Sequence, residues 1–386
     1  MTANTSMERG RGLLRALDRW LGVPLLALMG ILRSKRAKPD SFQSVGICVF
    51  AAIGDALLAS ALIADIKKAN PQLKITIFAT LANAQVFKLI RGWDELVLVP
   101  ITKPLAAIRQ LKAHPVDILI DSSQWPRIGA LICAWSPAKW TIGFQTQGQA
   151  RHFAYDCSVA HSSKIHELQN FRALLAPLGI KTGSMPSMNE SALAGAKPLN
   201  MKEPYLVFHP WASGNHFELR EWPAHSWLEL TKQALKAGYG VVFTGGPSDA
   251  ARANALFGEL EGAHPRAIAD GKLINLAGKA DLLATAAYLQ KAAALVSVNT
   301  GTMHLAALLE VPLVALHGPT NPDRWGPRYP GSGFKVTPIV IGPGRDKGGA
   351  YLNLGFEYPQ NPQYLMNQIL PQDVIEALRQ FSINID

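Results

Sequence analysis

Residues 295–308 read "LVSVNTGTMHLAAL", and this stretch joins an apolar run typical of a buried strand to the start of a helix. Between the two lie Asn299, Thr300 and Gly301, and His304 follows. A helix N-terminus has unpaired N–H groups and a partial positive charge, so it suits an anion. Gly301 lets backbone approach a ligand closely, Thr300 suits a cap or a phosphate, and His304 is placed to reach the same anion. The alternative is an ordinary capped turn with an incidental histidine.

Short apolar runs alternate with helix-length segments on both sides of this turn. The runs predict strands at 44–50, 73–79, 95–99, 116–121, 205–209, 239–246, 273–276, 294–298 and 312–316. Helices are predicted between them, for example at 55–69, and a last one at 371–381. This βαβ alternation is typical of a parallel sheet covered by helices on both faces.

The chain is long enough for two domains, and its 386 residues with 48% hydrophobic side chains are typical of a globular protein. Residues 181–203 are rich in Gly, Pro, Ser, Met and Asn without periodicity and predict a linker. We therefore expect an α/β protein whose two doubly wound, Rossmann-like domains face a cleft. The expected segments are 1–43, 44–180, the linker, 204–345 and a C-terminal extension with a helix at 346–386.

The N-terminal segment is basic and apolar. Eight Arg or Lys and three Asp or Glu fall in residues 1–40, which therefore carry half of the net charge of +10. Residues 20–32 have no charge, but a helix of this length is too short to span a bilayer, and Pro24 is expected to interrupt it. No signal-peptide cleavage site precedes the basic residues that follow. We expect an amphipathic segment that binds the membrane interface through residues 9–38, with a helix packed on the protein's own surface as the alternative.

Two further strand ends of the second half carry groups suited to a nucleotide diphosphate. "HPWASGNHFELREWP" follows strand 205–209 and contains Ser213 and Arg220, whose guanidinium suits a diphosphate. "FTGGPSD" ends at Asp249, which is placed to accept hydrogen bonds from ribose hydroxyls. The alternatives are a surface arginine and a helix cap.

In the first half, "FAAIGDALL" places Asp55 at the end of the first strand. Asp55 is either a helix N-cap or a general base. Candidate acceptor contacts also follow strand ends of this half: Gln124, Arg127, Gln145, Arg151 and His152.

Several motifs are absent from the sequence. It has no GxGxxG, no GxxxxGK[ST], no Asp-x-Asp pair, no GxSxG and no HExxH. Its three cysteines form no CxxC pair, which fits a reducing compartment and no zinc ribbon. A remaining basic excess spread over a large body does not indicate nucleic acid binding. We expect no metal and no cofactor, and phosphates held by Arg220 and helix ends.

"VSVNTGTMHLAALLEVPLVALHGPTNPDRWGP" strongly resembles the signature of glycosyltransferase family 9, the ADP-heptose:lipopolysaccharide heptosyltransferases. Similar segments are "VFAAIGDALLASALIADIKKANP", "HPWASG" with "REWP", and "LAGKADLLATAAYLQKAAALVSVNTG", so that the resemblance covers roughly residues 44–380. It implies a GT-B fold and an inverting, metal-independent transfer of a sugar. The implied partners are a nucleotide-sugar donor, ADP-heptose, and an anionic lipid-linked acceptor such as lipopolysaccharide core, at the cytoplasmic face of the bacterial inner membrane.

The resemblance also implies roles for single residues. Asp55 matches the family's catalytic carboxylate and Arg220 its basic residue on the diphosphate. Ser213 matches a phosphate-binding hydroxyl, Asp249 an acidic residue on the ribose, and Ala280 a backbone contact to adenine. The phosphate-binding turn is matched by Thr300, Gly301 and His304.

One residue departs from the family pattern, because Asn299 stands where Asp is usual. Asn keeps a carbonyl acceptor but loses the charge. Alternative functions therefore stay open: a GT-B enzyme with a UDP- or GDP-sugar donor, a sugar-nucleotide epimerase, or a catalytically silent membrane protein that binds a nucleotide-sugar. A nucleotide-dependent oxidoreductase would need the missing glycine fingerprint.

Overall fold

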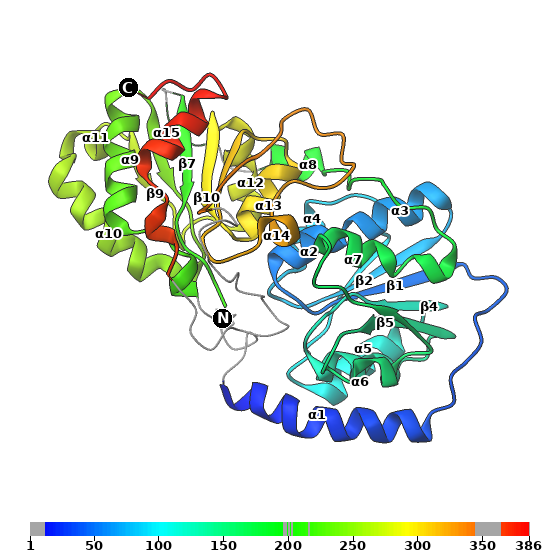
Figure 1. Cartoon of the computed structure of the whole chain (residues 1–386). Helices are drawn as coiled ribbons and strands as arrows, with labels where there is room; N and C mark the ends of the chain where they lie inside the picture. Colours follow the sequence, from blue (N-terminus) through cyan, green and yellow to red (C-terminus); the bar gives the residue numbers. More distant parts are fainter. Residues whose placement is uncertain are drawn as a thin grey trace. The chain divides into compact units, whose positions relative to one another are not determined.

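The computed structural model describes residues 12–195, 199, 201, 204–214, 217–343 and 364–385. The described chain forms two compact units, Met1–Asn189 and Glu190–Asp386 (Figure 1). The division falls within the predicted linker at 181–203. Residues 1–11 of the N-terminal segment and 346–363 of the C-terminal extension lie outside the described residues.

Unit 1 contains a six-stranded, fully parallel sheet in the order β3-β2-β1-β4-β5-β6. Its strands are β1 (Ser44–Val49), β2 (Lys74–Ala79), β3 (Glu95–Leu98), β4 (Ile118–Asp121), β5 (Trp140–Gln145) and β6 (Cys157–Ala160). Its helices are α1 (Gly12–Leu32), α2 (Ile53–Ala59), α3 (Ala61–Ala69), α4 (Ala84–Lys88), α5 (Pro104–Ala113), α6 (Arg127–Ala134) and α7 (Glu167–Ala173), with short 3₁₀ helices η2 (Arg151–Ala154) and η3 (Ala176–Leu178).

Unit 2 repeats this plan with a parallel sheet in the order β12-β11-β10-β7-β8-β9. Its strands are β7 (Tyr205–His209), β8 (Gly240–Phe243), β9 (Leu273–Asn275), β10 (Ala294–Val298), β11 (Leu313–Leu316) and β12 (Ile339–Ile341). Its helices are α8 (Glu190–Ala194), α9 (Ala224–Lys236), α10 (Ala250–Ala263), α11 (Pro265–Ala269), α12 (Leu282–Lys291), α13 (Gly301–Leu308), α14 (Pro322–Trp325) and α15 (Pro371–Arg379), with 3₁₀ helices η4 (Phe217–Arg220), η5 (Pro247–Asp249) and η7 (Met366–Gln368).

Helices cover both faces of each sheet, which explains the nearly continuous apolar strands. In unit 1, α5 and α6 lie on one face and α2, α3, α4 and α7 on the other (Figure 1). In unit 2, α9, α10 and α15 cover one face, and α12 and α13 cover the other. Both units reverse strand order at one point, between β1 and β4 and between β7 and β10. In open α/β sheets, ligands bind beside the carboxyl ends of strands at such a point.

The structure differs from the predicted elements in a few places. The helix predicted at 55–69 is divided at Ser60, whose hydroxyl donates to the Leu57 carbonyl at 2.6 Å. Strands β5, β6 and β12 were not predicted. The last two are short and half-exposed, so that they lack the apolar run that marks a buried strand.

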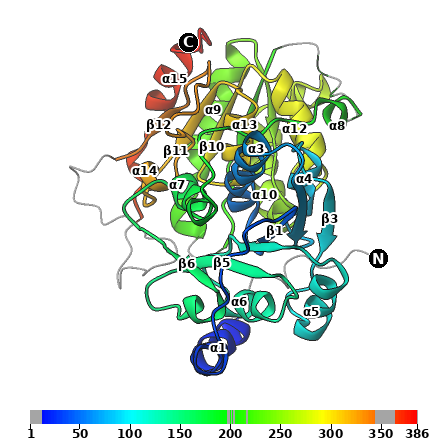
Figure 2. The same cartoon turned by 90° about the vertical axis from the view of Figure 1, so that its right-hand side faces the viewer.

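Within the N-terminal segment, residues Gly12–Leu32 form α1, which packs on unit 1, as Figure 2 shows for α1 and α6. Leu26 of α1 is fully buried in the core of unit 1. The expected interruption at Pro24 is wrong, because α1 continues through this exposed proline. Among the described residues, no helix is long and apolar enough to cross a membrane.

Candidate active site

The predicted nucleotide-binding residues follow the carboxyl ends of adjacent strands in unit 2. The turn at 299–301 leaves β10, the loop with Ser213 leaves β7, and the loop with Asp249 leaves β8. The strand order places β10, β7 and β8 side by side. The turn and the β7 loop therefore flank the point where strand order reverses, the expected ligand position of such a sheet.

The turn after β10 presents the N-terminus of α13. Helix α13 begins at Gly301 with Thr300 as its N-cap, and the Thr300 side chain makes no capping hydrogen bond. Both residues are half-buried, and the Thr300 hydroxyl lies 3.4 Å from that of Ser297. No acidic residue occupies the first turn of α13, so the positive end of the helix dipole is not neutralised within the helix. This arrangement suits a phosphate.

Asn299 is held inside unit 2 by its side-chain amide. Its Nδ2 lies 3.3 Å from His317 Nδ1 and 3.4 Å from the Trp325 carbonyl oxygen. Burial lowers the pKa of His317 to about 3, so its ring is neutral at pH 7. An asparagine can donate to a neutral ring and to a carbonyl, whereas an aspartate cannot. The asparagine at position 299 therefore fits its surroundings, because both of these contacts need a hydrogen-bond donor.

His304 lies in the first turn of α13 and is buried. Its Nδ1 lies 2.8 Å from the Tyr329 hydroxyl, and the two rings are stacked at 6.0 Å between centroids. The ring is therefore fixed by a residue 25 positions further along the chain.

Arg220 and Ser213 lie in the loop after β7. The Arg220 side chain is buried, and its Nη2 donates to the Ser213 carbonyl. Gly214 next to Ser213 has φ +91°, a conformation that favours glycine. The hydrogen bond holds the guanidinium against the exposed residues 213–214.

Asp249 acts in the structure as a helix cap and an ion-pair partner. Its Oδ2 accepts the Gly246 N–H at 2.8 Å, and its Oδ1 accepts from Arg252 at 2.5 Å. Arg252 also pairs with Glu221 from the β7 loop. Burial raises the pKa of Glu221, and the Arg252 charge opposes this shift. The Glu221–Arg252–Asp249 network thus connects two loops, while the ribose contact of Asp249 stays a prediction.

His209 is a site residue that the sequence did not single out, although it begins the "HPWASG" segment. It ends β7, with Nδ1 2.9 Å from the Thr244 hydroxyl and Nε2 3.3 Å from the Thr302 hydroxyl. Burial lowers its pKa to about 4, and the Asp249 charge opposes this only in part. A neutral His209 therefore connects the β8 loop to the first turn of α13.

Ala280 lies in the loop between β9 and α12 and is half-buried. Its N–H donates to the Leu276 carbonyl at 3.1 Å, so this N–H is already used within the loop. In the predicted contact with adenine, the backbone carbonyl oxygen of Ala280 would therefore be the group that binds.

In unit 1, Asp55 lies in the first turn of α2, directly after β1. Its Oδ2 accepts the Ala52 N–H at 3.2 Å, and the residue is half-buried. Asn83 fixes the loop before it, donating to the carbonyls of Val49 and Ala51 at 2.9 Å. Asp55 therefore acts as a capping residue at the point where strand order reverses, which keeps the general-base prediction open.

Two of the predicted acceptor contacts, Gln124 and Arg127, have side-chain partners within unit 1. Gln124 is buried and donates to Glu167 at 2.7 Å. Arg127 is 8% exposed and pairs with Asp18 of α1 at 3.3 Å. Both side chains thus have partners inside the unit.

Arg151 is fully buried and has partners inside unit 1, while its acceptor contact stays a prediction. Its Nη2 lies 2.7 Å from Asp121 Oδ2 and 2.8 Å from the Tyr155 hydroxyl. Tyr155 fits there because Gly143 has no side chain; a Cβ at Gly143 would lie 2.4 Å from the Tyr155 ring. Among the original candidates, Gln145 is exposed and His152 is half-buried.

Within the described residues, no group of three or more His, Cys, Asp or Glu side chains could hold a metal ion.

Two doubly wound units whose carboxyl edges carry these polar turns define a GT-B fold. Residues 105–332, more than half of the chain, match the model of glycosyltransferase family 9 (heptosyltransferase), and the protein belongs to this family.

The curated relatives that match this chain are also heptosyltransferases by name. The chain is similar to lipopolysaccharide heptosyltransferase 3 of Escherichia coli (strain K12), at 26% identity over 71% of this chain and 82% of the relative. It is 35% identical to lipopolysaccharide heptosyltransferase 1 of Pseudomonas aeruginosa over 42% of each chain. It is 33% identical to lipopolysaccharide heptosyltransferase 2 of Salmonella typhimurium over 32% of this chain and 34% of the relative. The last two matches thus span less than half of those relatives.

Solved structures share the fold over most of the chain. The structure of E. coli ADP-heptose lps heptosyltransferase II aligns with a TM-score of 0.67 at 20% identity, covering 88% of this chain and 98% of the other. A family 9 glycosyltransferase from Veillonella parvula aligns with a TM-score of 0.68 at 21% identity, covering 90% and 99%.

Proposed function

We propose that this protein transfers heptose from ADP-heptose to a lipopolysaccharide-core or related lipid-linked saccharide, with inversion at the anomeric carbon and without a metal ion. The observation that carries the proposal is the turn at 299–301, which opens α13 where strand order reverses in a chain of family 9. The names of the curated relatives support heptose as the sugar.

The donor diphosphate would bind the N-terminus of α13 and Arg220. The uncompensated N–H groups after Thr300 supply fixed dipoles, and Arg220 supplies a full charge fixed through the Ser213 carbonyl. Both would stabilise the charge that develops on the leaving diphosphate. The Ala280 carbonyl and Asp249 would contact the adenosine.

Asp55 would act as the general base. It takes the proton of the acceptor hydroxyl while that oxygen forms a bond to the anomeric carbon, and the bond from this carbon to the diphosphate oxygen breaks. ADP leaves with the electron pair of that bond. The capping bond from Ala52 orients the carboxylate and uses one of its several lone-pair sites.

The acceptor would bind unit 1 near Gln145, which is exposed at the end of β5. An anionic, lipid-linked acceptor fits the basic excess of the chain. We place the protein at the cytoplasmic face of the inner membrane as a peripheral protein.

Thermal stabilisation by nucleotides tests the donor site. ADP, UDP, GDP and CDP are each added to the wild-type protein, to Arg220→Ala and to Arg266→Ala, a matched control with an exposed arginine in α11. A ligand that binds only the folded state raises Tm by mass action. We expect ADP alone to raise Tm, with the shift lost in Arg220→Ala and kept in Arg266→Ala. A shift with UDP or GDP instead would contradict ADP-heptose as the donor.

A transfer assay with ADP-heptose and heptose-free lipopolysaccharide tests the reaction. We expect a product with inverted anomeric configuration, formed at the same rate with and without EDTA. Donor turnover to free sugar or epimer without acceptor would favour the epimerase, and donor binding without any turnover the silent binding protein.

A further inference from the structure

Helix α1 has an exposed apolar face, which we call the outer face of α1. It consists of Leu17, Trp20, Leu21, Leu25, Leu28, Ile31 and Leu32, whose side chains are 44–81% exposed. Among the described residues these are seven of the sixteen exposed large hydrophobic side chains, so such side chains are concentrated here. A contiguous apolar face of this kind marks a contact surface.

The opposite face of α1 is fixed to unit 1. Asp18 accepts the backbone N–H groups of Arg127 and Ile128, at 3.2 and 2.9 Å, where α6 begins. Gly22 and Gly30 allow a close approach: a Cβ would lie 2.8 Å from Arg127 Cβ at Gly22 and 2.5 Å from the Phe153 ring at Gly30. The two alternatives predicted for this segment, a membrane contact and a helix packed on its own protein, therefore belong to different faces of one helix.

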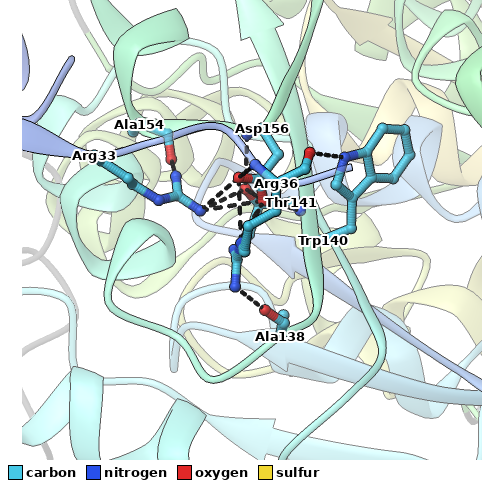
Figure 3. A network of polar contacts seen from close by, with 7 residues as sticks. All are labelled: Arg33, Arg36, Ala138, Trp140, Thr141, Ala154 and Asp156. Carbon is cyan, nitrogen blue, oxygen red and sulfur yellow. Dashed lines mark hydrogen bonds and ion pairs between the residues drawn. The ribbon is translucent and has the colours of Figure 1, made fainter. Parts of the chain in front are cut away.

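The chain after α1 is held by two arginines that share one buried carboxylate (Figure 3). Arg33 and Arg36 pair with Asp156 at 3.1 and 2.8 Å, and the Asp156 side chain has no exposed surface. Thr141 adds a backbone N–H donor at 2.8 Å. Burial would raise the pKa of Asp156, but the hydrogen bonds and the arginine charges lower it. Pulling α1 off unit 1 would leave a buried carboxylate without its cations, which is costly.

The charges around the outer face are basic. Arg19 and Lys35 are exposed near the two ends of the apolar face, whereas Asp18 is turned inward onto α6. A second copy of this chain is a poor occupant, because an antiparallel contact would place Arg19 against Lys35 and a parallel one would place Arg19 against Arg19. An anionic lipid surface satisfies both the apolar face and the cations.

We propose that α1 remains docked on unit 1 while its outer face lies in the interface of an anionic membrane. The inference rests on the proposed peripheral location and deepens it, because it assigns the contact to one face of α1. Since α1 is fixed along its inner face, membrane binding would set the orientation of unit 1 relative to the lipid.

Vesicle flotation tests the surface. Wild-type protein is mixed with vesicles of phosphatidylglycerol and phosphatidylethanolamine, or of phosphatidylcholine alone. We expect stronger binding to the first, weakened by salt. Trp20→Ser combined with Ile31→Ser should reduce binding about 10- to 100-fold, because each side chain contributes apolar area. Leu98→Ser combined with Leu370→Ser is the matched control with exposed apolar residues elsewhere and should bind as wild type.

A disulfide tests whether α1 stays docked. Gly30→Cys and Phe153→Cys are introduced in a Cys157→Ser background; the Cβ positions lie 3.1 Å apart, close to the range of about 3.5–4.5 Å in disulfides. The oxidised protein should bind vesicles as well as the reduced one. Loss of binding on oxidation would overturn the docked helix.

Wild-type protein that binds neither vesicle would overturn the peripheral location as well. Binding of Trp20→Ser/Ile31→Ser equal to that of the wild type would overturn only this inference. Nucleotide-dependent Tm shifts, which the α1 variants should keep, report separately on the proposed donor site.

Discussion

The two units have the same strand order but treat buried polar groups differently. Unit 1 buries carboxylates against arginines: Asp121 with Arg151, Asp65 with Arg172, and Asp156 with the partly exposed Arg33 and Arg36. Near the carboxyl edge of its sheet, unit 2 buries neutral imidazoles, His209 and His317, against hydroxyls and an amide. Its nearby carboxylates, Glu221 and Asp249, share Arg252.

This difference fits the two proposed tasks. Around the N-terminus of α13, the two buried imidazoles are neutral and no acidic residue lies in the first turn, which leaves the positive end of the helix for a diphosphate. In unit 1, hydrogen bonds from Asn83 to the Val49 and Ala51 carbonyls fix the loop before Asp55, the proposed base. The comparison predicts that loss of the proposed base in unit 1 changes the rate of transfer and not donor binding, and that the two units lose stability in different pH ranges.

The largest effect is expected for Asp55→Asn, which keeps the capping acceptor of α2 but removes the proposed base. The rate of transfer should fall about 10²- to 10⁴-fold, the usual contribution of a general base, while ADP affinity is unchanged. Single-turnover kinetics measure the rate of transfer, and calorimetric titration with ADP measures the affinity. Asp40→Asn, an exposed aspartate, is the control. A near-normal rate would remove Asp55 from the mechanism.

Arg151→Ala should destabilise unit 1 by about 3–5 kcal/mol, because it leaves Asp121 buried without its cation. Urea unfolding measures this loss. Arg109→Ala on the exposed side of α5 should change the free energy of unfolding by less than about 0.5 kcal/mol. Unchanged stability with a raised KM for the acceptor would instead support Arg151 as an acceptor contact.

A smaller effect is expected in the pH dependence of stability, which should differ between the two units. In the unfolded chain both imidazoles titrate near pH ~6.5, whereas in the folded state His209 titrates at about 4 and His317 at about 3. Below pH ~6.5 the unfolded chain binds more protons, so the stability of unit 2 should fall as pH falls. Glu221 has a raised pKa and therefore works against this loss of stability, but it is a single group, whereas the two imidazoles both contribute to the loss.

Unit 1 should hold to lower pH. The Lys139 hydrogen bond, opposed by burial, lowers the pKa of Asp117 to about 2, and the pKa of Asp156 is also lowered. Their stabilisation is present above the ordinary aspartate pKa and is lost as pH falls through the lowered folded-state pKa of each group, which for Asp117 is about 2. Hydrogen exchange in peptides from β7 and β10, compared with β1 and β4 between about pH 4 and pH 7, measures the difference. Equal loss of protection in both units would contradict it.

Asn299→Asp sharpens this comparison. A carboxylate beside His317 favours the protonated ring and removes the donor to the Trp325 carbonyl. We expect a loss of about 1–3 kcal/mol at pH 7 and a shallower decline on acidification. Asn254→Asp, at an exposed position of α10, is the control in urea unfolding at both pH values.

Much of the fold was predictable, because strands buried on both faces and the helices between them leave local patterns in the sequence. The runs around β1, β7 and β10 were found almost to the residue. Strand β12 was not, since three half-exposed residues carry no pattern. The positions of Asp55 and Arg220 after strand ends were also predictable, but their partners, Ala52 and the Ser213 carbonyl, were not.

The sequence by itself determined the two parallel sheets, the turn at 299–301 and the basic, apolar N-terminal segment. Only the tertiary structure decided that Arg151 is an internal ion-pair partner, that His209 connects the β8 loop to the first turn of α13, and that α1 has a docked face and an exposed face. The reason is physical: periodicity is a local property of the chain, whereas ion pairs such as Arg33–Asp156 join residues more than a hundred positions apart. Their partners exist only once the chain has folded.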